Sequence, residues 1–70
     1  MAEANSIKNK AVSLINDYFG EDTAKMYADF YKTQEDSVVL TSLLQLLTEF
    51  MGETGAKEVM TSNGLTVPAN

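Results

Sequence analysis

The sequence predicts an all-α protein, a small four-helix bundle made of two similar helical hairpins. Apolar residues recur every three to four positions, two glycines interrupt this pattern, and the sequences around both glycines are alike. The expected helices cover about residues 5–19, 22–33, 36–51 and 54–62 of one domain, 1–70. Hairpin 1 would span about 5–33, hairpin 2 about 36–62, and a tail 63–70.

The segments around the two glycines align without gaps at an offset of 32 residues, which places Gly20 on Gly52. Residues 14–25 and 46–57 share Leu, Gly, Glu, Ala and Lys. Glycine permits the positive φ that helix ends often need, and the acidic residue after it suits the N-terminus of a following helix. We therefore predict a repeated helix–Gly–helix unit; the alternative is chance similarity between two amphipathic helices that end at glycine.

The first, second and fourth predicted helices are each indicated by one apolar face. Asn5 or Ser6 can cap the first helix. Its apolar face comprises Ile7, Ala11, Leu14, Ile15 and Tyr18. The face of the second helix comprises Ala24, Tyr27, Ala28 and Tyr31. The polar residues 33–36 connect the hairpins. The short fourth helix has a stripe of Ala56, Val59 and Met60 and ends at Asn63-Gly64, after which Leu65 and Val67 can pack back.

The third helix, 36–51, has apolar residues in two adjacent rows. The first row is Val39, Leu43, Leu46 and Phe50, and the second row is Leu40, Leu44, Leu47 and Met51. Together the rows cover roughly 160° of the helix, which is wider than the apolar stripe of a one-sided surface helix. Chains below roughly 70–80 residues usually need a disulfide, a metal or a partner for stability. We therefore predict that the second row binds a partner, most simply in a homodimer, rather than being covered within the chain.

The aromatic residues of the first two helices are expected to pack in the core, with hydroxyls reaching its rim. A groove for an aromatic ligand or a partner helix is the alternative. These residues are Tyr18, Phe19, Tyr27, Phe30 and Tyr31.

Several kinds of chemistry are disfavoured by composition. The chain contains no Cys, His or Arg and no glycine-rich phosphate loop, so neither an enzymatic constellation nor a cofactor or zinc site is indicated. The acidic pairs Glu21-Asp22 and Glu35-Asp36 lack the spacing of a calcium loop and suit helix starts. We therefore predict a non-enzymatic interaction or regulatory module without a metal.

The charge balance bears on partners and location. The net charge is −5 and the five lysines are dispersed, which argues against binding to nucleic acid or to anionic membrane surfaces. No apolar run approaches the roughly 18 residues of a membrane span, and the first residues do not resemble a secretory signal. We expect a cytoplasmic protein that binds a protein partner or itself.

Asp36-Ser37-Val38, at the start of a leucine-rich helix, supports an alternative. In a short, acidic, helical chain this motif resembles that of the acyl carrier proteins, and Leu43, Leu47 and Glu49 continue the match. The resemblance implies that Ser37 would carry a phosphopantetheine arm. Val38 stands where that family has Leu, and the Phe and Asp-Leu-Gly residues expected upstream are absent.

Overall fold

The computed structural model describes residues 7–68. Within that range it has no strands and four helices: α1 (Ile7–Phe19), α2 (Glu21–Tyr31), α3 (Asp36–Met51) and α4 (Glu53–Ser62). The predicted all-helical class is confirmed, and the predicted bounds agree to within two residues where they can be compared. The predicted caps Asn5 and Ser6 lie outside the described residues. No helix of the described chain is long and apolar enough to cross a membrane.

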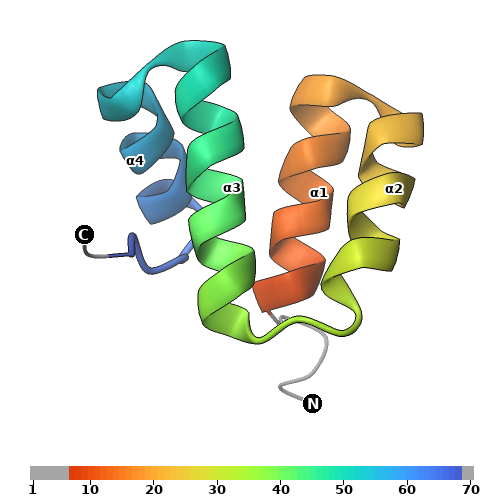
Figure 1. Cartoon of the computed structure of the whole chain (residues 1–70). Coiled ribbons are helices and arrows are strands. Elements are labelled where there is room, and N and C mark those ends of the chain that lie inside the picture. The colour runs from red at the N-terminus through yellow and green to blue at the C-terminus, as the bar shows by residue number, and fades with distance from the viewer. Residues whose placement is uncertain (1–6, 69–70) are drawn as a thin grey trace.

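The helices form two antiparallel pairs that meet along α1 and α3 (Figure 1). Helices α1 and α3 run side by side in the same direction, with α2 beside α1 and α4 beside α3. Both glycine connections lie at one end of the molecule, and the connection from α2 to α3 lies at the other end. We call these the glycine end and the connection end.

One hydrophobic core joins all four helices. Its largest fully buried side chains include Ile15 of α1, Tyr31 of α2, Leu43 and Leu47 of α3 and Met60 of α4. Leu65, which follows α4, is also buried in this cluster. Among the described residues, no buried side-chain nitrogen or oxygen lacks a hydrogen-bond partner. The chain thus closes its core on its own side chains.

The two glycine connections have nearly the same backbone geometry. Gly20 has φ 98° and ψ 166°, and Gly52 has φ 87° and ψ 163°, a region that only glycine occupies readily. Each glycine N–H donates to the preceding helix, at Asn16 O (3.1 Å) and Thr48 O (2.8 Å). Each glycine carbonyl accepts a bond from the alanine four residues later. Because the glycine itself caps the next helix, α2 and α4 begin one residue earlier than predicted.

The predicted packing of Leu65 against the bundle is confirmed. The N–H of Gly64 donates to Thr61 O (3.0 Å) and that of Leu65 to Met60 O (2.9 Å). This is the Schellman arrangement, which commonly includes an apolar contact across the helix end. Leu65 and Met60 are both buried, so the chain beyond α4 contributes to the core.

A polar contact joins α2 to α3 near the connection end. The buried Tyr31 hydroxyl donates a hydrogen bond to Ser42 Oγ at 3.0 Å. Helix α2 ends at Tyr31, two residues before the predicted Thr33, and Gln34 N–H then bonds to Tyr31 O in a turn. Burial raises the pKa of Tyr31 above the ordinary 10.0, and the bond to Ser42 opposes this only partly.

The backbone of Gly52 generates a first prediction. An added Cβ at Gly52 would meet nothing within 4 Å, so the cost of Gly52→Ala comes from the backbone conformation alone. We expect a loss of about 1–3 kcal/mol in the free energy of unfolding. Thermal unfolding followed by circular dichroism should show a Tm lower by at least about 4 °C.

The control is Gly55→Ala, inside α4, where φ is not positive. Its Cβ would lie 3.2 Å from Cγ of Met51, a flexible side chain that can shift. We expect less than half of the loss measured for Gly52→Ala. Equal losses in the two variants would contradict the backbone explanation.

The buried Tyr31 gives a second prediction, a fall in stability at alkaline pH. Because the folded state raises the pKa of Tyr31, it favours the protonated hydroxyl. The resulting stabilisation is complete below the unfolded value of 10.0 and is lost as pH rises towards the folded value. Chemical denaturation from pH 8 to 11 should show this decline, and Tyr31→Phe should reduce it.

At neutral pH, Tyr31→Phe should cost about 0.5–1.5 kcal/mol, the usual net value of one hydrogen bond. The half-buried Ser42 hydroxyl limits the loss, because it can turn towards water. An alkaline decline of the same size in both proteins would refute the assignment to Tyr31.

Candidate interaction surface

The residues predicted to bind a partner do not form one exposed row. Leu40 is 8% exposed and Leu47 is fully buried, so the expectation that the second row faces outward fails at these two positions. Leu44 and Met51 are half-buried and pack against the core. The physical reason is that α1 and α4 both pack against α3 and together cover its wide apolar surface.

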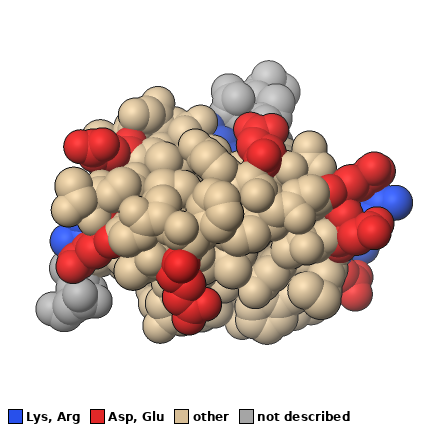
Figure 2. Space-filling model, turned by 90° about the horizontal axis from the view of Figure 1, so that it is seen from above, with Lys and Arg blue, Asp and Glu red and all other residues tan. Residues whose placement is uncertain are grey.

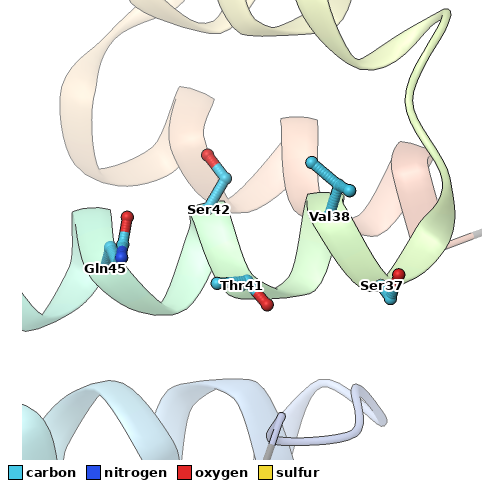
Figure 3. A pocket seen from close by; sticks show the side chains of 5 residues that line it. All are labelled: Ser37, Val38, Thr41, Ser42 and Gln45. Carbon is cyan, nitrogen blue, oxygen red and sulfur yellow. The ribbon is translucent and has the colours of Figure 1, made fainter. Parts of the chain in front are cut away.

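Ser37, the alternative attachment point, lies exposed in the first turn of α3. It borders an open depression of about 320 Å³ with Val38, Thr41, Ser42 and Gln45, all from α3. Figure 3 shows Val38 and Ser42 pointing to the same side of the helix. Since one helix supplies the whole lining, the depression does not enclose a small molecule.

Aromatic side chains meet at the glycine end, where α1 and α3 finish. The Phe50 ring lies edge-on to that of Phe19, with centroids 5.0 Å apart, and is tilted against Tyr18 at 5.9 Å. Phe50 is 56% exposed and Tyr18 is 40% exposed, whereas Phe19 is half-buried. We call these three residues the aromatic patch. It combines residues from both hairpins that are far apart in the sequence.

The predicted burial of the aromatic residues is therefore only partly correct. Tyr31 is buried, Phe19 and Tyr27 are half-buried, and Tyr18 and Phe30 are exposed. Phe50 was assigned to the first apolar row of its helix together with Leu43, which is buried. Periodicity alone could not separate the two, because it does not tell where neighbouring helices stop covering a row. The signal in the sequence that could have indicated the aromatic patch is an aromatic residue two positions before each glycine, Tyr18 before Gly20 and Phe50 before Gly52.

Carboxylates surround this end of the molecule. Asp17 and Glu49 directly precede the two exposed aromatic residues, while Glu21, Asp22 and Glu53 follow the glycines, and all five are exposed. Figure 2 looks onto the glycine end and shows a broad uncharged centre, with Asp and Glu spread around it and lysines at the margin. The surface at the glycine end therefore has exposed aromatic rings with negatively charged side chains around them.

Two of these carboxylates have partners on their own helices. Glu53 accepts a bond from Lys57 Nζ at 2.9 Å, and Glu21 lies 3.7 Å from Lys25 Nζ, both exposed i,i+4 pairs. The hydrogen bond from Lys57 and its positive charge lower the pKa of Glu53. Within the described residues, Asp17, Asp22 and Glu49 form no ion pair.

The acidic residues do not assemble into a metal site in the part of the chain that is described. No group of three or more Asp or Glu residues is arranged there to hold an ion. No family model, curated protein or solved structure matches this chain.

Proposed function

We propose that this protein is a non-enzymatic interaction module and that its partner docks on the aromatic patch. The observation behind this proposal is the exposure of Phe50 and Tyr18, which touch each other at the glycine end. Large aromatic side chains at the centre of an interface commonly supply most of its binding energy. The packing of Phe50 against the half-buried Phe19 restrains the patch before a partner arrives.

The size of the patch sets the expected strength of binding. Complete burial of a large apolar side chain is worth about 1.5–3 kcal/mol, and both rings are already partly covered. Association also costs translational and side-chain freedom. Two anchors of this kind support a reversible contact, so further contacts along α1 and α3 would be needed for tight binding.

The proposal includes the prediction that both hairpins are copies of one unit. This prediction is supported by the nearly equal φ and ψ angles of Gly20 and Gly52. It is also supported by the equivalent i,i+4 ion pairs that begin directly after each glycine. The exposed rings, Tyr18 and Phe50, also correspond at the offset of 32 residues. A duplicated unit would explain why the aromatic patch receives one ring from each hairpin.

The homodimer and the cytoplasmic location also stay predictions within this proposal. Two features of the sequence favour a homodimer, the short chain and the wide apolar surface of α3. Because Leu40 and Leu47 are buried where α1 and α4 pack against α3, the apolar surface of α3 no longer calls for a second copy, and only the small size of the chain does. Sedimentation at several protein concentrations measures self-association directly.

The proposal is tested by comparing Phe50→Ser with Met26→Ser. Both substitutions remove an exposed apolar side chain, but Met26, which is 63% exposed, lies on α2 outside the patch. We expect a partner crosslinked in cells of the native host to be lost with Phe50→Ser, because its anchor is gone, and retained with Met26→Ser. Circular dichroism should show both variants folded. Equal capture by the two variants would contradict docking at the patch.

The carrier function is the second candidate, favoured by the exposure of Ser37 at the start of α3. An attachment serine must be accessible to the modifying enzyme, and Ser37 meets this requirement. Coexpression with a phosphopantetheinyl transferase followed by intact-mass measurement separates the two functions. We expect an unchanged mass for an interaction module. A gain equal to one phosphopantetheine group that Ser37→Ala abolishes would establish the carrier function instead.

A further inference from the structure

Two carboxylates at the aromatic patch occupy positions that helix physics disfavours. Asp17 and Glu49 lie in the last turns of α1 and α3, where the negative end of each helix dipole repels a carboxylate. Neither last turn contains a basic residue. By contrast, Glu21, Asp22 and Glu53 lie in first turns, where the dipole favours them. Helix stability explains the second set and not the first.

The disfavoured carboxylates are also unneutralised within the described chain. The described ion pairs of Lys25, Lys32 and Lys57 are with Glu21, Asp29 and Glu53. Lys8 donates to the backbone carbonyl of Lys32, at the other end of α2. Asp17 and Glu49 are therefore available to a cation from outside.

We infer that the aromatic patch binds a cationic amphipathic helix, which places apolar side chains on Phe50 and Tyr18 and Lys or Arg side chains beside Asp17 and Glu49. This inference rests on the proposed function and adds the chemistry of the partner. A cation also binds favourably over the face of an exposed aromatic ring, so rings and carboxylates select the same charge. Such a partner buries the two exposed rings and neutralises the two carboxylates in the same contact.

A second copy of the chain does not fit this surface. In the symmetric pairing that homodimers commonly use, it would bring the same carboxylates against Asp17 and Glu49, and each chain has a net charge of −5. Like charges placed together across an interface cost binding energy and suppress that pairing. If copies associate, we expect them to do so elsewhere.

The test uses the ¹⁵N-labelled chain of all 70 residues and three synthetic amphipathic peptides. The peptides have identical leucine positions and differ only in having Lys, Gln or Glu at every polar position. We expect the Lys peptide to shift the amide signals around Tyr18 and Phe50. The Gln peptide should bind at least about tenfold more weakly, and the Lys affinity should fall as salt is raised. Equal binding of the Lys and Gln peptides would overturn the inference.

Matched variants separate a local effect from overall charge. Asp17→Asn with Glu49→Gln and Glu35→Gln with Asp36→Asn each remove two negative charges, the second pair at the connection end. We expect the first double variant to weaken Lys-peptide binding about tenfold and the second less than about twofold. Equal weakening would show general charge attraction only and would refute the inference.

The Tm of the first double variant distinguishes loss of the binding charges from damage to the fold. Damage to the fold would lower the Tm, whereas loss of these charges should not. Replacing Asp17 and Glu49 removes unfavourable dipole contacts, so Tm should stay the same or rise while binding falls. The second double variant removes the favourable Asp36 from the first turn of α3, so its Tm should not rise. Weaker binding with a lowered Tm in the first double variant would overturn the inference.

The outcomes also distinguish this inference from the proposed function. A native partner that needs Phe50, together with equal binding of the Lys and Gln peptides, would keep the interaction module and reject its cationic partner. If neither the native partner nor the Lys peptide depends on Phe50, both fail. A wild-type dimer that Phe50→Ser converts to monomer in sedimentation would make the occupant a second copy and overturn the inference.

Discussion

The arrangement of the chain depends on the burial of α3, whose apolar side chains cover two adjacent rows that one neighbouring helix cannot hide. Helix α1 and helix α4 both pack against it, and Val39, Leu40, Leu43 and Leu47 are buried as a result. This requirement places α3 beside α1 in the middle of the molecule, with α2 and α4 outside them (Figure 1). It also explains why Leu65 folds back, since α4 alone is only ten residues long.

The connections follow from the same requirement. The chain must reverse directly after α1 and directly after α3, so that each outer helix lies along its inner partner. One glycine with positive φ makes each reversal, Gly20 the first and Gly52 the second. At the opposite end, the bond from Tyr31 to Ser42 links α2 to α3, and Lys8 reaches the carbonyl of Lys32. The connection end is thus closed by contacts between helices. At the glycine end the backbone of Gly20 and Gly52 makes the connections, and the side chains of Phe50 and Tyr18 stay exposed to solvent.

Much of the fold could be predicted from the sequence because helix signals are local. Periodic apolar residues and glycine stops gave the four helices and, for α3, both of its bounds, 36 and 51. The coverage of each apolar row could not be predicted, since it depends on which helices become neighbours. Leu40 and Leu47 were therefore expected at a partner surface although they are buried, and Tyr18 was expected in the core although it is exposed. The candidate site was missed for the same reason: its rings come from two helix ends that only the tertiary structure brings together.

The aromatic patch is the place where this chain departs most from what folding alone favours. A core of this size is marginal, so a short chain can hardly spare the stability that a carboxylate at the negative end of a helix dipole takes away, or the burial that an exposed ring fails to contribute. Both departures occur in both hairpins at equivalent positions, Asp17-Tyr18 and Glu49-Phe50. Departures from local stability rules concentrate at functional sites. A cationic apolar partner would compensate both costs together, whereas an uncharged apolar partner would leave the carboxylates as they are.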